Sequence, residues 1–121
     1  MPDTRKQLGD FGEQVALGYL LRLGMREVTR KWRCRAGEID LVMRDGATLV
    51  FAEVRTRRDG NAAESVDARK QARLARLAYS YLAAHDMPDD MLWRIDVVAI
   101  AIGRSGRADM IEHIRNAVSE G

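Results

Sequence analysis

The apolar residues near the start of the chain recur at the spacing of an α-helix. From residue 4 to residue 23 they form one stripe, and Gly24 follows it as a natural stop. Glu13 falls at the border of this stripe. Glycines inside the segment each cost about 1 kcal/mol relative to alanine, which is tolerable where another element packs closely against them: Gly9, Gly12 and Gly18. The pattern predicts a helix over residues 4–23.

The next apolar segments predict strands. Residues 28–34 alternate in the manner of a strand and carry basic side chains on both faces. Asp45-Gly46 is a strong hairpin signal between two further strand-like segments, residues 39–43 and 49–54. The sequence therefore predicts a β-hairpin with Asp45 and Gly46 as its loop.

One face of this hairpin is apolar, and the other changes character along its length. With the predicted loop, Asp40 faces Phe51 and Glu38 faces Glu53 across the strands. The apolar face, predicted to be core, carries Ile39, Leu41, Met43, Val50, Ala52 and Val54. The other face holds charges at its open end: Glu38, Asp40, Glu53 and Arg55. Charges are rarely buried without partners, so a bound cation, salt bridges to arginine or exposure to solvent must compensate them.

A loop and a second helix follow the hairpin. Residues 56–66 are rich in turn-forming residues and predict a mobile loop. Asp67 suits the N-cap of a helix that reaches about His85. This helix has a buried apolar stripe and an exposed basic face that includes Arg69, Lys70, Arg73 and Arg76.

The end of the chain predicts two more strands. Residues 92–102 are apolar on both faces except at Arg94 and Asp96, which is typical of a central strand covered on two sides. We interpret Asp96 as a structural acid that pairs with an arginine or a backbone donor. Residues 110–114 predict a short final strand before a polar tail. The order of elements predicts an α/β sandwich in which helices cover a mixed sheet.

Length and composition restrict the class of protein. The chain of 121 residues is expected to form one domain, residues 1–121. An apolar content of 46% and a charged content of 31% are ordinary for a globular protein. No segment approaches the ~18 apolar residues of a membrane span, and the N-terminus lacks the apolar core of a signal peptide. The single Cys34 suits a reducing cytoplasm, where we expect the protein to act.

The net charge of +2 hides an uneven distribution. Residues 26–35 hold five basic side chains against one acid, and residues 55–76 hold seven against three. Of the 20 basic residues 17 are arginine, whose planar fork suits phosphate oxygens. The distribution indicates either a polyanionic partner such as nucleic acid or a solvated face rich in arginine.

Two motifs carry a resemblance to a known family. GEIDLV at residues 37–42 and VFAEVRTR at residues 50–57 resemble the YraN family of bacterial proteins. That family is similar in turn to archaeal Holliday-junction resolvases and to the wider restriction-endonuclease-like nucleases. Matching positions extend along nearly the whole chain, from Gly9 to Ala117. The resemblance implies a restriction-endonuclease-like α/β/α sandwich with a central mixed β-sheet.

The resemblance also implies a catalytic site. Asp40 and Glu53 match the acids of the two nuclease motifs, Glu13 matches a helix glutamate that joins them, and together they would hold Mg²⁺ or Mn²⁺. Arg55 stands where the nuclease motif has lysine. Arginine stays protonated and cannot accept a proton from an attacking water, but it can stabilise charge on the scissile phosphate. Lys70 is a candidate to take the place of the missing lysine.

Three functions are compatible with these features. The first is a metal-dependent endonuclease that acts on DNA, including branched DNA, with Glu13, Asp40, Glu53 and Arg55 as catalytic residues. A symmetric homodimer would suit such an enzyme, because a four-way junction presents two equivalent strands. The second is a nucleic-acid-binding module without catalysis, and the third is a protein-interaction domain without nucleic acid. Residues expected to contact nucleic acid are Arg33, Arg35, Arg57, Arg58, Arg69, Lys70 and Arg73.

Overall fold

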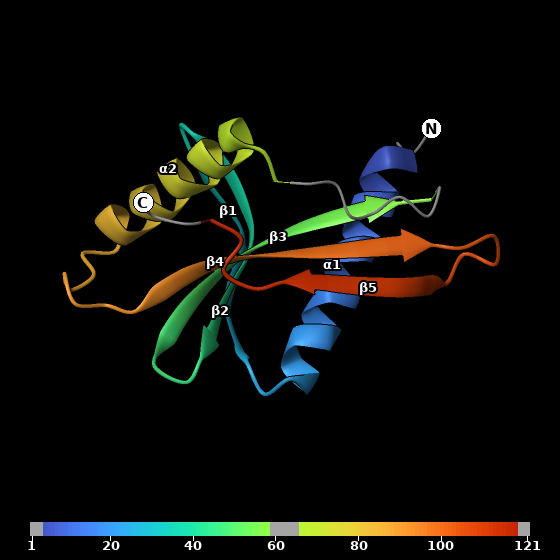
Figure 1. Ribbon diagram of the computed structural model, residues 1–121, viewed down its shortest axis with the longest axis horizontal. Helices are drawn as coiled ribbons and strands as arrows, with labels where there is room; N and C mark the ends of the chain where they lie inside the picture. Colours follow the sequence, from blue (N-terminus) through green and yellow to red (C-terminus); the bar gives the residue numbers. More distant parts are fainter. Residues whose placement is uncertain (1–3, 59–65, 119–121) are drawn as a thin grey trace.

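The computed structural model describes residues 4–58 and 66–118 as five strands and two helices (Figure 1). In chain order these are α1 (Thr4–Arg22), β1 (Arg26–Cys34), β2 (Gly37–Asp45), β3 (Thr48–Arg57), α2 (Ala68–Ala84), β4 (Trp93–Ile102) and β5 (Ala108–Ile114). Neither helix in this described part has the length and apolar character needed to cross a bilayer. The predicted α/β class is confirmed.

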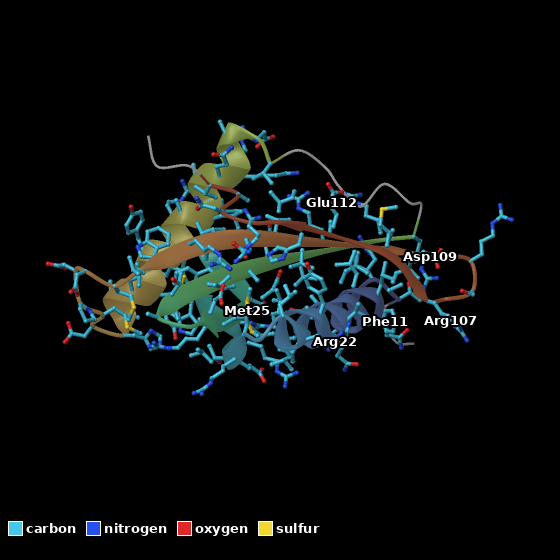
Figure 2. All side chains as sticks on the ribbon, turned by 60° about the horizontal axis from the view of Figure 1, so that its bottom comes forward. Phe11, Arg22, Met25, Arg107, Asp109 and Glu112 are labelled. Atoms are coloured by element: carbon cyan, nitrogen blue, oxygen red, sulfur yellow. The ribbon has the colours of Figure 1, made fainter. Side chains whose placement is uncertain are left out.

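The strands form one mixed sheet in the order β1-β2-β3-β4-β5. β3 and β4 are parallel and are connected through α2, whereas the other three pairs are antiparallel. The two helices pack against opposite faces of the sheet, with α1 on one side and α2 on the other (Figure 2). This arrangement is compatible with a restriction-endonuclease-like sandwich.

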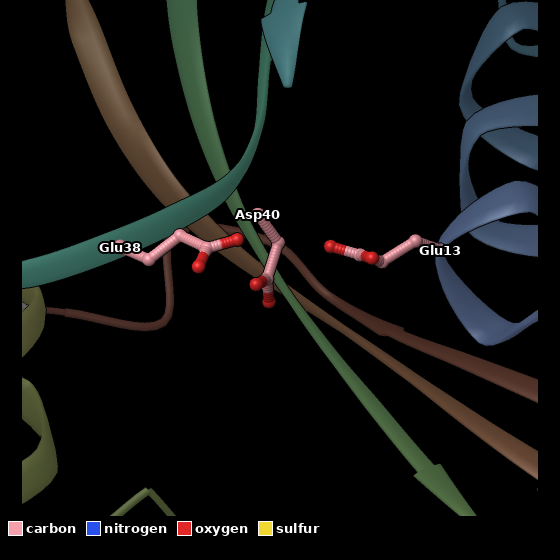
Figure 3. Close-up of side chains that lie close together, drawn as sticks. All are labelled: Glu13, Glu38 and Asp40. Atoms are coloured by element: carbon pink, nitrogen blue, oxygen red, sulfur yellow. The ribbon is translucent and has the colours of Figure 1, made fainter. Parts of the chain in front are cut away.

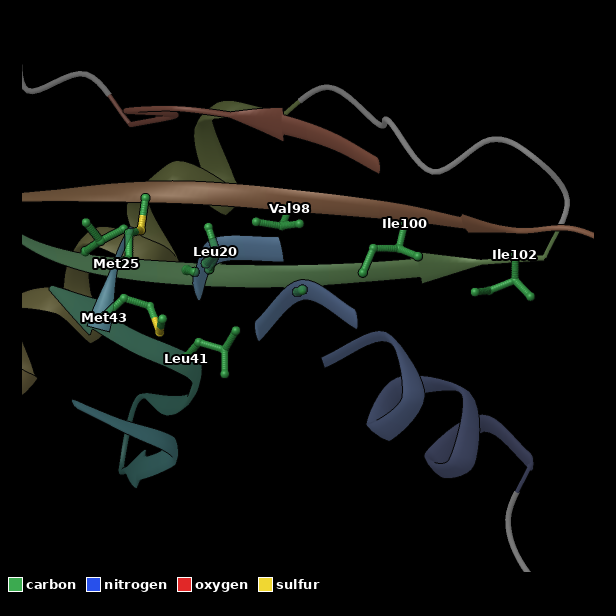
Figure 4. Packing of buried hydrophobic residues seen from close by; sticks show 10 residues of the cluster. Leu20, Met25, Leu41, Met43, Val98, Ile100 and Ile102 are labelled. Atoms are coloured by element: carbon green, nitrogen blue, oxygen red, sulfur yellow. The ribbon is translucent and has the colours of Figure 1, made fainter. Parts of the chain in front are cut away.

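Each face of the sheet has its own apolar core. On the α1 face, Leu20 packs with alternate residues of β2 and β4, among them Leu41, Val98 and Ile100 (Figure 4). On the α2 face, side chains of that helix pack on the intervening strand residues. β4 is buried on both faces, which confirms the prediction of a central strand.

The hairpin loop lies one residue further along the chain than predicted. Asp45 pairs with Thr48, so Gly46 and Ala47 form the loop, and Gly46 has a φ of 60°. A loop whose first residue alone has a positive φ suits glycine at that position, whereas a loop of Asp45 and Gly46 would place the aspartate in the left-handed region. The predicted facing pairs are therefore wrong by two residues.

Ile39 lies on the opposite face of the sheet from the one predicted. It was predicted to share a core face with Leu41, but it packs in the α2-side core while Leu41 packs in the α1-side core. Residues two apart in a regular strand lie on one face, so β2 changes its facing at Asp40. This change allows Asp40 to project where neither core covers it completely.

Several segments differ from their predicted extent or character. β3 continues to Arg57, so the first residues of the predicted loop belong to a strand; most of that loop lies outside the described residues. β5 begins two residues earlier than predicted, at Ala108. In the predicted polar tail, Ala117 and Val118 are partly buried and pack against the α2-side core. The N-cap prediction is confirmed, because Asp67 Oδ1 accepts the Lys70 N–H at 2.9 Å.

Gly12 determines how closely α1 approaches the sheet. A Cβ at this position would overlap the Thr56 side chain, including Thr56 Cβ at 2.9 Å, whereas a Cβ at Gly9 would meet nothing within 4 Å. Gly12→Ala is expected to lower the free energy of unfolding by about 1–2 kcal/mol, because overpacking outweighs the gain of about 1 kcal/mol in helix propensity. Urea unfolding would measure it. Gly9→Ala is the matched control and is expected to be neutral or stabilising; equal gains in both variants would contradict the close packing.

Candidate functional site

Three carboxylates from two elements converge beside the sheet. Glu13 extends from α1 toward Asp40 and Glu38 of β2, and oxygen atoms of the three side chains lie within 4.8 Å of one another (Figure 3). The motifs predicted a group of Glu13, Asp40 and Glu53, with Glu38 at the same charged end of the hairpin. In the structure Glu38 belongs to the closest group, while Glu53 lies nearby on the same groove.

The end of the β2–β3 ladder positions Asp40. The last pair between these strands is Leu41 with Ala52. Beyond it, Asp40 Oδ2 accepts the Val54 N–H at 2.8 Å, so a side-chain carboxylate takes a backbone donor of β3 at the end of the ladder. Asp40 is therefore held by a backbone donor of β3 at the point where regular pairing of the two strands ends.

Burial and like charges act together on these acids. Burial raises the pKa of Asp40 to about 7, opposed by the hydrogen bond from Val54 N–H and assisted by the negative charges of Glu13, Glu53 and Glu38. Burial also raises the pKa of Glu13, although the hydrogen bond and charge of Lys31 oppose that effect. Such a cluster gains the most from a cation, because a positive charge relieves both burial and repulsion.

Glu53 lies between two arginines. Its Oε1 accepts a hydrogen bond from Arg73 Nη2 at 2.8 Å, and its Oε2 lies 3.7 Å from Arg55 Nη2. Oε2 is buried, and no described residue donates a hydrogen bond to it. The predicted common face of Glu53 and Arg55 is therefore present, and Glu53 keeps one oxygen able to accept a further ligand.

An open groove of about 450 Å³ contains the acids together with basic side chains. Lys31 Nζ lies 2.6 Å from Asp10 Oδ1 and 3.3 Å from Glu13 Oε2. Arg33 Nε lies 3.3 Å from Glu38 Oε2. Glu13, Glu38 and Glu53 thus each have a basic partner. Of the three ways of compensating the acids that the sequence allowed, salt bridges are the one present at these residues.

The remaining residues expected to contact nucleic acid lie outside the described lining of the groove. Arg35 is exposed in the turn between β1 and β2, and Arg58 is exposed directly after β3. Arg57 ends β3, and Arg69 and Lys70 lie in the first turn of α2. None of these five is among the described residues that line the groove, so the site gives no support to Lys70 as a substitute for the motif lysine. Arg33 and Arg73, by contrast, line the groove itself.

Asp96 belongs to a separate buried network, as the sequence analysis interpreted it. Its Oδ1 accepts hydrogen bonds from Arg94 Nε and Asn116 N–H, both at 3.0 Å. Its Oδ2 lies 2.8 Å from His113 Nε2, and His113 Nδ1 lies 3.1 Å from the Tyr19 hydroxyl. The network joins β4, β5 and α1.

The cluster of three carboxylates offers the oxygen ligands that a hard divalent cation prefers. Mg²⁺ and Mn²⁺ prefer oxygen ligands, and the cluster offers carboxylates of Glu13, Glu38 and Asp40. The buried Oε2 of Glu53 adds an acceptor that no described donor satisfies. Such an atom requires a partner, since an unsatisfied buried polar group costs about 1–3 kcal/mol.

Comparison with known proteins identifies the family. The profile of the uncharacterised protein family UPF0102 matches residues 12–100. The chain belongs to the UPF0102 family. This family is the YraN family, so the resemblance seen in the motifs is confirmed.

Relatives in the UPF0102 family align over nearly the full chain. A UPF0102 protein of Chloroflexus aurantiacus is 51% identical over 120 residues, and one of Roseiflexus castenholzii is 53% identical over 123 residues; each alignment covers 99% of both chains. A third, of Pelotomaculum thermopropionicum, is 45% identical over 120 residues, covering 97% of this chain and 99% of the relative. The carboxylate groove falls mainly within the residues that match the UPF0102 profile.

Sequence reasoning missed three charged residues that line the groove: Lys6, Asp10 and Lys31. Of these, Lys31 was counted in a basic stretch and given no role of its own. A partial signal existed, because Asp10 and Glu13 are three residues apart on a helix and so present two acids on one side. Nothing in the local pattern identified Lys31 as their partner, since β1 and α1 meet only in the folded chain.

Proposed function

We propose that the protein is a cytoplasmic, metal-dependent endonuclease that hydrolyses phosphodiester bonds of DNA. The observation that carries this proposal is the convergence of Glu13, Glu38 and Asp40 in an open groove that also contains arginines. Carboxylates that share a small space suit a divalent cation, and arginines beside them suit phosphate oxygens. The likeness of the motifs to resolvase-like nucleases supports the same chemistry and favours branched DNA as the substrate.

The residues of the groove have distinct parts in this proposal. Glu13, Glu38 and Asp40 would hold Mg²⁺ or Mn²⁺, which when bound supplies an activated water and stabilises charge on the phosphate. Arg55 is 12% exposed and lies next to Glu53, outside the described lining of the groove, and it would stabilise negative charge on a phosphate that reaches it. Arg73 and Arg33 hold the backbone of the nucleic acid at the rim.

Cleavage of a DNA panel tests the proposal. Linear, flapped and four-way substrates would be incubated with and without Mn²⁺, and cleavage is expected with the metal. Asp40→Asn is expected to lower the rate by about a hundredfold or more, because it removes a charged ligand. Asp90→Asn makes the same change at an exposed position before β4 and should leave the rate unchanged. If the protein bound Mn²⁺ but cleaved none of these substrates, the proposed endonuclease activity would be contradicted.

A nucleic-acid-binding module without catalysis is the second candidate. Two observations favour it: Glu13, Glu38 and Glu53 have basic partners within the chain, and Arg55 cannot act as a general base. This candidate binds DNA or RNA with an affinity that falls steeply as salt rises and that is equal with and without Mn²⁺. An affinity that does not change with salt would favour a protein-interaction domain instead.

A further inference from the structure

Lys31 places an ammonium group at the edge of the carboxylate cluster. Its Nζ contacts Asp10 Oδ1 at 2.6 Å and Glu13 Oε2 at 3.3 Å, and the side chain lines the same groove as Glu38 and Asp40. Because Glu13 belongs to the cluster, the ammonium lies where it neutralises one of the converging acids. The protein therefore contains a cation of its own at this site.

The backbone at Lys31 is held in an unusual conformation. Its φ is 55°, in the left-handed region that residues other than glycine, asparagine and aspartate rarely adopt. Arg30 pairs with Leu41 and Trp32 with Ile39, so Lys31 and Asp40 fall between the same two pairs, and the register leaves both unpaired. The two strands thus deviate together, β1 at Lys31 and β2 at Asp40, and both deviations place charge in the groove. Backbone strain of this kind clusters at functional sites, where the surrounding structure maintains it.

We infer that Lys31 is the internal counter-ion of the cluster, and that a divalent cation binds only by displacing its ammonium group from Glu13. This inference rests on the metal site of the proposed function. A bound cation would lie about 2.1–2.5 Å from a Glu13 oxygen, and an ammonium still in contact with that carboxylate would repel it strongly. Asp10 offers Lys31 the shorter contact, so the ammonium can remain with Asp10 while it leaves Glu13.

The consequence is that Lys31 weakens metal binding. The ammonium group already interacts with the Glu13 carboxylate. A metal ion must break this interaction before it can bind the same carboxylate. A variant without the ammonium should bind the metal more tightly, which is the opposite of what is expected when a residue that supports the site is removed.

Calorimetric titration of the full chain with Mn²⁺, without nucleic acid, tests the inference. The variant is Lys31→Gly, because glycine adopts the left-handed backbone without strain and should keep the fold. Its affinity for Mn²⁺ is expected to rise by about tenfold or more over the wild type. Lys6→Met is the matched control: it also removes one positive charge that faces Asp10, at 3.9 Å, and it is expected to change the affinity less than about twofold, because exposed charges are well screened.

The outcomes separate this inference from the proposed function. If Lys31→Gly binds Mn²⁺ as the wild type does, or more weakly, while Asp40→Asn abolishes binding, the metal site stands and the role of Lys31 is overturned. Equal gains in Lys31→Gly and Lys6→Met would also overturn it, since net charge would then explain the effect. If neither the wild type nor Lys31→Gly binds the metal, both proposals fail.

Discussion

Asp40→Asn is expected to stabilise the metal-free protein at pH 8, although it removes a residue of the candidate site. Burial first, and then neighbouring acids, raise the pKa of Asp40 to about 7 from 3.8. Between those pH values the folded protein keeps the proton and the unfolded chain loses it, so the free energy of unfolding of the wild type falls as pH rises. Above pH 7 the full cost is present, up to about 4 kcal/mol.

The asparagine variant avoids this cost because it carries no charge and can still accept the Val54 N–H. Thermal unfolding at pH 8 should therefore show a rise in Tm on the order of 10 °C, and the difference from the wild type should vanish below pH 4. Added Mn²⁺ should stabilise the wild type by mass action and leave Asp40→Asn unchanged.

Asp90→Asn is the control for loss of a carboxylate, and it should follow the wild type at every pH. A destabilised Asp40→Asn at pH 8 would mean that the ionised carboxylate has favourable partners in the folded state, and the reasoning from burial would be wrong. A variant that gains as much from Mn²⁺ as the wild type would place the metal elsewhere.

The elements of the fold could be predicted where the signal lies within one segment. The N-cap at Asp67 and the continuous apolar run of β4 each specify their structure locally. The hairpin was also predicted, but its register depends on a difference of one residue in the loop. Two adjacent candidates, Asp45-Gly46 and Gly46-Ala47, both contain the glycine that the turn requires, so composition alone could not choose between them.

The candidate site shows the same division more sharply. Glu13, Asp40 and Glu53 were found from motifs, and all three line the groove. Glu38 was predicted to face Glu53 and to share the charged end of the hairpin with Asp40, and the structure places it with Asp40 and Glu13, where β2 changes its facing. Periodicity cannot predict a break in periodicity. The contact of Lys31 with α1 depends on the same irregular region, so the periodicity of the sequence could not predict it either.

The arginine partners of the acids bear on both candidate functions. The ion pair of Arg73 with Glu53 places a positive charge against this half-buried acid before any metal or phosphate arrives. The same arginine, 41% exposed, is free to rotate toward a phosphate at the rim of the groove. Pairing inside the groove is therefore compatible with a site that exchanges internal partners for a ligand, and the response to Mn²⁺ distinguishes such a site from a purely structural one.

Asp96→Ala is expected to cause the largest loss of stability, about 3–5 kcal/mol, because it removes one partner of a buried charge network. The carboxylate is 0% exposed, and its loss leaves Arg94 Nε, His113 Nε2 and the Asn116 N–H without the oxygen atoms that they contact. Against a typical total of about 5–15 kcal/mol, such a loss would leave the protein close to unfolding at 37 °C. Urea unfolding at pH 7 measures it.

Graded variants test whether the charge of Asp96 or only its shape matters. Tyr19→Phe removes the outermost hydrogen bond of the network and should cost about 1 kcal/mol. Asp96→Asn keeps an acceptor for Arg94 and Asn116 but removes the charge, so its cost should fall between those of Tyr19→Phe and Asp96→Ala. If Asp96→Asn were as stable as the wild type, the network would act through hydrogen bonds alone, and Asp45, 3.1 Å from Arg94, would be enough to compensate the arginine.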